Sequence, residues 1–277
     1  MITVSIVTYR TDLEELAKCL ASLRSDVVKR IYVIDNASER RMQEFCREQG
    51  EMVEYIANSN TGYGAGHNIA LRKVMQDGDV QYHLVLNTDV EFDPSVLGIL
   101  HRYMDENSDV GQVQPAILYP NGKLQYTVRK LPTPWDLIVR RFVPWGKHTR
   151  HNHRYTLRHI DHDTEFDVPY HQGCFMLIRI DALREVGLFD ERFFMYPEDI
   201  DLTRRIHRKY RTMYTPICTV VHAHRAASYY DLRMTWIHIV NICRYFNKWG
   251  WICDRERSEC NLELDRLAIE QEKKLQN

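Results

Sequence analysis

The sequence lacks the two kinds of segment that would place a chain in or across a membrane. The first residues, Met1 to Val7, have neither the basic start nor the long apolar core of a secretory signal peptide. No stretch approaches the ~18 apolar residues of a spanning helix. We therefore expect a cytoplasmic protein.

Cysteine is scarce and unpatterned, and the charge is balanced. The 277 residues contain seven cysteines, an odd number, and no pair has the C-x-x-C spacing. This argues against a disulfide framework and against a zinc knuckle. The 37 basic and 38 acidic residues leave a formal net charge of -1. The whole molecule thus has no electrostatic attraction for nucleic acid, which we do not expect as a partner.

Two common nucleotide-binding motifs are also missing. The dinucleotide fingerprint G-x-G-x-x-G does not occur, and the glycine-rich turn from Asn60 to Gly66 is not followed by the G-K-[ST] of a P-loop. A nucleotide would have to be bound in another way.

The first 120 residues alternate short apolar strands with helical segments. The expected strands are Ile2 to Thr8, Ile31 to Ile34, Val53 to Ile56 and His83 to Leu86. This order predicts an α/β fold with a mostly parallel sheet flanked by helices. Ligands of such sheets bind in the crevice beyond the carboxyl ends of the strands. Thr8, Asp35, Asn60 and Asp89 follow strand ends and should face that crevice.

The pattern changes after residue 120. The tract Arg129 to His159 is rich in Arg, Lys, His and aromatic residues, and its only acidic residue is Asp136. Apolar order returns at Gly173 to Ile178, and the chain after Tyr230 is mostly helical in character. We therefore predict a catalytic domain over 1–230, with a nucleotide-binding half of about 1–120 and an acceptor-binding half of about 121–230. A helical C-terminal segment follows over 231–277.

Three groups of residues could carry chemistry. Asp89 ends a strand, where a carboxylate can hold a divalent cation or merely cap a turn. Glu198, Asp199 and Asp201 begin an expected helix, and they exceed the number of carboxylates that helix capping requires. His222 and His224 end another expected strand, where either could be a metal ligand or a surface residue.

Taken in order, several short motifs resemble the inverting glycosyltransferases of family 2, which have the GT-A fold, and within them the rhamnosyltransferase-like bacterial enzymes of polysaccharide synthesis, including that of O-antigen. The resemblance covers about residues 2 to 228. Its motifs are Ser5-Ile6-Val7-Thr8-Tyr9, Val33-Ile34-Asp35-Asn36-Ala37-Ser38, Asn60-Thr61-Gly62-Tyr63-Gly64-Ala65-Gly66-His67-Asn68, Leu86-Asn87-Thr88-Asp89, Gly173-Cys174-Phe175-Met176 and Glu198-Asp199-Ile200-Asp201-Leu202.

The resemblance implies a set of binding residues. Asp89 would be the metal-binding end of a D-x-D element whose first position is Asn87 here, with His222, or less favourably His224, as a second ligand of Mg²⁺ or Mn²⁺. Gln172 and Gly173 would lie near the donor sugar and the acceptor. The residues implied to hold the nucleotide are Thr8, Tyr9, Asp35, Asn60, Gly62 and Asn68.

The implied reaction is a single displacement that inverts the anomeric carbon. Asp199 would take the proton of the acceptor hydroxyl, while Glu198 and Asp201 orient the site. Arg204 or Arg205 would pair with Asp201. The donor would be a dTDP- or UDP-sugar, with dTDP-rhamnose favoured by the resemblance. The acceptor would be a glycan or a polyprenyl-diphosphate-linked glycan.

Two questions stay open at this point. The basic tract and the aromatic segment Trp236 to Trp251 could attach the protein to the inner face of the membrane. Alternatively, the aromatics form core or homodimer contacts and the tract is an acceptor loop. The function has two alternatives as well, a nucleotidyltransferase and a catalytically inactive nucleotide-sugar-binding protein.

Overall fold

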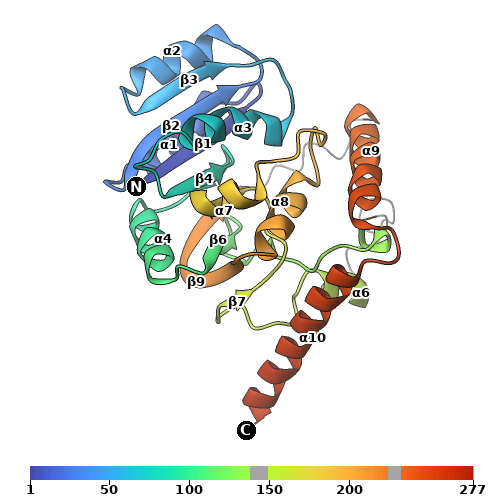
Figure 1. Cartoon of the computed structure of the whole chain (residues 1–277). Helices are drawn as coiled ribbons and strands as arrows, with labels where there is room; N and C mark the ends of the chain where they lie inside the picture. The colour runs from blue at the N-terminus through green and yellow to red at the C-terminus, as the bar shows by residue number, and fades with distance from the viewer. Residues whose placement is uncertain (138–148, 224–231, 277) are drawn as a thin grey trace.

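The structure, a computed structural model, describes residues 1–137, 149–223 and 232–276 (Figure 1). Within these ranges the strands form one sheet in the order β3-β2-β1-β4-β8-β6-β9-β5, with β7 paired to β9. The strands are β1 (Ile2–Thr8), β2 (Val28–Asp35), β3 (Val53–Ala57), β4 (Tyr82–Leu86), β5 (Val90–Glu91), β6 (Val110–Leu118), β7 (Phe166–Asp167), β8 (Phe175–Arg179) and β9 (Arg211–His222). The helices are α1 (Leu13–Ser22), α2 (Arg40–Glu48), α3 (Tyr63–Val74), α4 (Ser95–Glu106), α6 (Arg150–Tyr155), α7 (Ile180–Val186), α8 (Glu198–His207), α9 (Leu232–Trp249) and α10 (Arg255–Gln276).

The predicted α/β fold is confirmed, and the sheet is more mixed than predicted. The strands β3, β2, β1 and β4 run parallel, as their alternation with helices requires. Beyond them β8 is antiparallel to both β4 and β6, and β9 is antiparallel to β5 and β7. The prediction of a mostly parallel sheet therefore holds for the N-terminal half of the sheet. The periodicity of a short apolar strand does not encode its direction.

Helices cover both faces of the sheet because successive strand residues point to opposite sides. Ile31 and Val33 of β2 join the core beneath α1, α2 and α4, while Ile34 joins the core beneath α3, α7 and α8. On β8, Leu177 joins the first of these cores and Ile178 joins the second. The strands are thus buried on both faces, which leaves their ends as the places for polar side chains.

A buried polar network ties β1 to β4 and α3. The hydroxyl of Ser5 lies 2.7 Å from Nε2 of His83 and 2.6 Å from Nδ1 of His67, and Thr3 is 2.8 Å from Nδ1 of His83. Burial lowers the pKa of His83 to about 3, so this imidazole is neutral in the folded protein at neutral pH.

The two C-terminal helices pack against the rest of the fold. Arg204 of α8 is almost fully buried, and its guanidinium bonds Asp254 at 2.6 and 2.8 Å and Glu256 at 2.6 and 2.9 Å. It also lies 4.1 Å from the ring centre of Trp249. The far end of α10 extends away from the sheet (Figure 1). None of the helices in the described ranges is both long and apolar enough for a bilayer crossing.

Candidate active site

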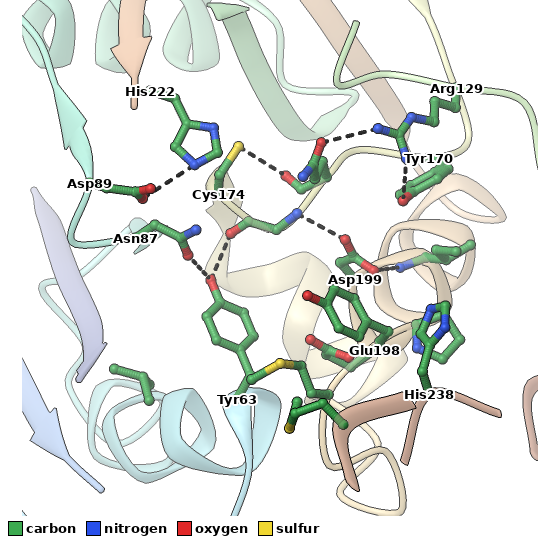
Figure 2. Close-up of a pocket in the computed structure, with 18 of the residues that line it drawn as sticks. Tyr63, Asn87, Asp89, Arg129, Tyr170, Cys174, Glu198, Asp199, His222 and His238 are labelled. Atoms are coloured by element: carbon green, nitrogen blue, oxygen red, sulfur yellow. Dashed lines mark hydrogen bonds and ion pairs between the residues drawn. The ribbon is translucent and has the colours of Figure 1, made fainter. Parts of the chain in front are cut away.

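A cavity of about 460 Å³ lies beside the carboxyl end of β4, between the sheet, α8 and α9 (Figure 2). Its walls include residues 87–89 after β4, residues 172–174 before β8 and residues 195–200 at the start of α8. Seven residues predicted for the site meet here. They are Asn87, Asp89, Gln172, Gly173, Glu198, Asp199 and His222.

One side of the cavity holds Asp89 and His222. The pairing of β5 with β9 sets Val90 opposite His222, and this brings Nε2 of His222 to 3.2 Å from a carboxylate oxygen of Asp89. The other ring nitrogen lies 3.0 Å from the side-chain oxygen of Gln125. Burial lowers the pKa of His222, but the hydrogen bonds to Asp89 and Cys174 outweigh it and raise the pKa to about 10.

This pair fits a hard divalent cation. A bound cation would have to displace the proton that Nε2 of His222 shares with Asp89, and the two donor atoms, 3.2 Å apart, could then bind one ion. Mg²⁺ is usually held by one or two carboxylates together with substrate phosphates. Among the described residues no group of three or more His, Cys, Asp or Glu side chains could hold a metal. The alternative ligand His224 lies outside the described residues. Asp89 and His222 are thus described residues that could hold such an ion, which would need further ligands such as phosphate oxygens.

The opposite side holds Glu198 and Asp199, the first two residues of α8. Asp199 accepts hydrogen bonds from the backbone N–H of Gly173 at 2.9 Å and of Ile200 at 2.8 Å. Burial raises the pKa of Asp199, while these N–H groups and the nearby Arg129 oppose the rise. Burial, with the neighbouring Asp199, raises the pKa of Glu198 further, well above its usual value. The two carboxyl groups are thus suited to different protonation states.

Oε2 of Glu198 is buried and has no hydrogen-bond partner within the described part of the chain. A buried carboxyl oxygen without a hydrogen-bond partner costs free energy. A proton on Glu198 or a polar group of a ligand would reduce that cost. Glu198 lines the cavity, where a ligand could supply the missing partner.

Tyr63, which the sequence does not single out, connects the two sides. Its hydroxyl lies 2.7 Å from the carbonyl oxygen of Gly173 and 2.9 Å from the side-chain oxygen of Asn87 (Figure 2). Burial and the nearby Glu198 raise the pKa of Tyr63 well above its usual value, so the hydroxyl stays protonated. Asn87, at the first position of the expected D-x-D element, thus contacts Tyr63. The only signal for Tyr63 was its place inside the glycine-rich motif.

Arg129 is a second functional candidate that the sequence did not assign a role. It is half-buried, and its guanidinium reaches the hydroxyl of Tyr170 at 3.4 Å and the side-chain oxygen of Gln172 at 3.3 Å. It is the cation that faces Asp199 in the cavity. In the sequence, Arg129 is one of the many cations of the basic tract, and nothing there singles it out.

Two residues predicted for the site, Asp201 and Asn68, do not line the cavity. Asp201 is fully buried outside the cavity, where it bonds Arg205 at 2.9 Å, Lys248 at 2.6 Å and the indole N–H of Trp249 at 2.8 Å. The prediction that Arg204 or Arg205 pairs with Asp201 holds for Arg205. Asp201 thus joins α8 to α9.

Asn68 is the second of these. Its side chain donates to the carbonyl oxygen of Phe189 and to Glu191, both at 2.9 Å, and it accepts from the N–H of Phe189 at 3.0 Å. These bonds engage the amide fully and connect α3 to the loop before α8. The structure therefore does not bring Asn68 to the cavity.

The residues predicted to hold the nucleotide form a separate group at the ends of β1 and β2. Thr8 donates to Asp35 at 3.3 Å, and Asp35 also accepts from two backbone N–H groups of the loop before α2. Asn60 accepts from Asn36 at 3.4 Å. Tyr9 is 53% exposed and available to a ligand. None of these residues is among those that line the described cavity, and their nucleotide contacts remain a prediction.

Gly62 comes just before α3, and its surroundings leave no room for a side chain. Its φ is 107°, and a Cβ added there would lie 2.3 Å from the carbonyl oxygen of Phe194. That oxygen accepts from the N–H of Tyr63 at 2.8 Å. Glycine is thus required for α3 to begin against this loop, which places Tyr63 for its contact with Gly173.

The C-terminal helix α9 contributes to the cavity, which sequence analysis did not foresee. Met234, His238 and Ile242 are among the residues of its wall. The predicted boundary at residue 230 remains a prediction, since 224–231 lie outside the described residues. The helix beyond it nevertheless belongs to the site.

Comparison with known proteins identifies the family of this chain and several relatives. The sequence pattern described as Glycosyl transferase family 2 matches residues 3–187. Rhamnosyltransferase WbbL of Escherichia coli K12 is 27% identical over 276 residues, which cover 97% of this chain and 98% of that protein. An N-acetylglucosaminyl-diphospho-decaprenol L-rhamnosyltransferase of Mycobacterium tuberculosis is 27% identical over 82% of this chain and 77% of its own. A third relative, the low-salt glycan biosynthesis hexosyltransferase Agl10 of Haloferax volcanii, is 28% identical over 75% of this chain, which spans 62% of that protein.

Solved structures support the fold. The mannosyltransferase PcManGT of Pyrobaculum calidifontis, solved with GDP-Man and Mn²⁺, superposes with a TM-score of 0.60 at 16% identity, over 96% of this chain and 69% of its own. GalNAc-T7, solved with UDP, GalNAc and Mn²⁺, superposes with a TM-score of 0.59 at 16% identity, over 81% of this chain and 43% of its own.

The fold is of the GT-A type, and the family match and the named relatives show that the protein is a glycosyltransferase. The chain belongs to glycosyl transferase family 2, and its relatives are rhamnosyltransferase-like. The family resemblance predicted from the sequence is confirmed.

Proposed function

We propose that this protein transfers a hexose, with inversion, from a nucleoside diphosphate sugar to a hydroxyl of a lipid-diphosphate-linked glycan. The observation that carries the proposal is the composition of one cavity. A cation-binding pair, Asp89 and His222, lies on one side of it, and a buried carboxyl pair, Glu198 and Asp199, lies on the other. A donor diphosphate and an acceptor hydroxyl need these two kinds of group at opposite ends of the reacting bond.

In the proposed mechanism Asp199 is the general base. Its two oxygens are oriented by the N–H groups of Gly173 and Ile200, and each keeps a lone pair for an acceptor hydroxyl. Glu198, which holds its proton more firmly, would donate a hydrogen bond to a bound sugar. Asp89 and His222 would hold a divalent cation, which neutralises the charge of the leaving diphosphate when it is bound.

The donor and the acceptor are proposed by analogy. Names of the relatives include a rhamnosyltransferase and an enzyme acting on a diphospho-decaprenol-linked sugar, and this supports dTDP-rhamnose as donor and a lipid diphosphate as acceptor. An enzyme with such an acceptor must work at a membrane surface, so peripheral attachment at the inner face is part of the proposal.

Product analysis tests the proposed function. The protein would be incubated with Mn²⁺, a panel of dTDP-, UDP- and GDP-sugars and a short-chain lipid-diphosphate-linked N-acetylglucosamine. We expect one donor to yield free nucleoside diphosphate and an extended acceptor. Release of pyrophosphate would indicate a nucleotidyltransferase instead. Binding of a donor without any turnover, across a range of acceptors, would indicate an inactive binding protein.

A further inference from the structure

A second cavity, of about 640 Å³, adjoins the first and shares Arg129 with it. It lies between the segment that directly follows β6 and the residues that directly follow α6. Its lining residues are Tyr119, Asn121, Lys123, Leu124, Tyr126, Arg129, Thr156 and Arg158. Arg129 and Arg158 belong to the basic tract Arg129 to His159, and the proposed transfer reaction does not use this cavity.

The charge of the second cavity has one sign. Lys123, Arg129 and Arg158 line it, and no carboxylate is among its lining residues. Two other cations of the same tract, Lys130 and Arg154, pair with Asp265 of α10 at 2.6 and 3.0 Å. The three cations of the cavity have no ion pair within the described residues. Unpaired cations that face one hollow favour a polyanion there.

Several hydrogen bonds of Arg129 are long. Those to Tyr126, Tyr170 and Gln172 measure 3.3 to 3.4 Å, at the outer limit for such bonds, and Tyr155 is a further polar neighbour. An anion in the second cavity could replace them with shorter, charge-assisted bonds. Arg129 and Asp199 both line the first cavity, so an anion bound by Arg129 in the second cavity would lie toward the place where the acceptor hydroxyl is activated.

Arg158, another of the cations that line the second cavity, stacks on an aromatic ring. Its guanidinium lies 4.8 Å from the ring centre of Tyr126, within the range of a cation–π interaction. Such stacking restricts the side chain and leaves its N–H fork free to bind oxygen atoms in pairs. Lys123, which is exposed at the rim, adds a mobile point charge.

We propose that Lys123, Arg129 and Arg158 bind the diphosphate of the acceptor, so that the second cavity is the site that distinguishes a lipid-diphosphate-linked sugar from a free one. The inference rests on the proposed function and deepens it. A sugar attached to this diphosphate would extend past Arg129 into the first cavity, where its hydroxyl meets Asp199.

The test measures anion binding without any turnover. Titration calorimetry in EDTA, which disfavours diphosphate binding at the metal site, would use geranyl diphosphate as the lipid-linked probe and inorganic pyrophosphate as the free anion. Sedimentation with phosphatidylglycerol vesicles would report on headgroup binding. The test variant is Lys123→Ala with Arg158→Ala. The matched control, Lys18→Ala with Arg150→Ala, removes one exposed Lys and one exposed Arg that line neither cavity.

We expect the dissociation constant of both diphosphate probes to rise about tenfold or more in the test variant and to stay near the wild-type value in the control. Equal binding in wild type and test variant, no binding by either, or equal weakening in the control would overturn the proposal. So would loss of vesicle binding alone, which would make the cavity a headgroup site. Because no donor is present, these outcomes are independent of whether the protein transfers sugar.

Discussion

The hydroxyl of Tyr63 is connected to the carboxylate of Asp199 through a single residue, Gly173. The carbonyl oxygen of Gly173 accepts from Tyr63 at 2.7 Å, and its N–H donates to Asp199 at 2.9 Å. Tyr63 also contacts Asn87, which is two residues before Asp89. A residue on α3 therefore positions both the proposed base and the segment that carries the proposed cation ligand.

Tyr63→Phe should lower kcat more than it changes the donor KM. Loss of the hydroxyl leaves the carbonyl of Gly173 without its partner and loosens the orientation of Asp199. A net hydrogen bond contributes about 0.5 to 1.5 kcal/mol, which corresponds to a reduction of roughly two- to tenfold. Steady-state kinetics with varied donor measure both constants. Tyr103→Phe, which removes a surface hydroxyl bonded to Glu165, is the control. An equal effect of both variants would contradict the positioning role.

Asp199→Asn should abolish transfer while donor binding persists, because the base acts on the acceptor and not on the nucleotide. General-base assistance is worth about 10² to 10⁴ in rate. The comparison is made by turnover and by donor titration, with the exposed Asp181→Asn as a control. Residual turnover of about a tenth of the wild-type value would remove Asp199 from this role.

Glu198→Gln should be much milder than Asp199→Asn. The raised pKa of Glu198 favours the protonated carboxyl, and an amide reproduces a neutral hydrogen-bond donor of similar shape. The same turnover assay, run in parallel, ranks the two variants. If Glu198→Gln is the more damaging substitution, Glu198 and not Asp199 acts as the ionised base.

Asp89→Ala and His222→Ala should each raise the Mn²⁺ concentration needed for half-maximal donor binding, by about tenfold or more, since each removes a proposed ligand. A metal titration of donor binding measures this. His101→Ala, which changes a histidine remote from the cavity, should leave the titration unchanged. Wild-type metal dependence of the His222 variant would point to His224 instead.

Acid should destabilise the fold through His83. Its folded-state pKa is about 3, against about 6.5 in the unfolded chain, so between these values the unfolded state binds one more proton. The free energy of unfolding therefore falls as the pH falls through this window, by up to about 1.4 kcal/mol per pH unit. Urea unfolding measures the free energy of unfolding between pH 5 and 6. In His83→Gln the slope of this free energy against pH should be smaller than in the wild type by the equivalent of about one bound proton. His153→Gln, at the surface, should keep the wild-type slope.

Much of the fold follows from local patterns. The predicted strand Ile2 to Thr8 is observed at the same bounds, and the strands predicted around Ile31, Val53 and His83 lie within β2, β3 and β4. Runs of apolar residues separated by helical segments leave few other arrangements. The direction of β8 was not predictable in this way, because it depends on the path taken by the preceding segment.

The site residues, like the fold, could be predicted only in part. The motifs identified Asp89 and Asp199, and the end of a predicted strand suggested His222; the structure brings these three residues to one cavity. Asp201 and Asn68 also belong to family motifs, yet their side chains bond to the scaffold. Neighbouring residues of a motif point in different directions once a helix forms. A motif therefore names the segment at the site, and the helix rotation decides which of its side chains enters.

By itself, the sequence determined the class of fold, the family and the segments that meet beyond the strand ends, because apolar periodicity and short motifs are local properties of the chain. Only the tertiary structure decided that Asp89 contacts His222, that Tyr63 reaches Asp199 through Gly173, and that Arg129 lies between two cavities. These contacts join residues far apart in the chain. They depend on strand order and helix packing, which no local pattern encodes.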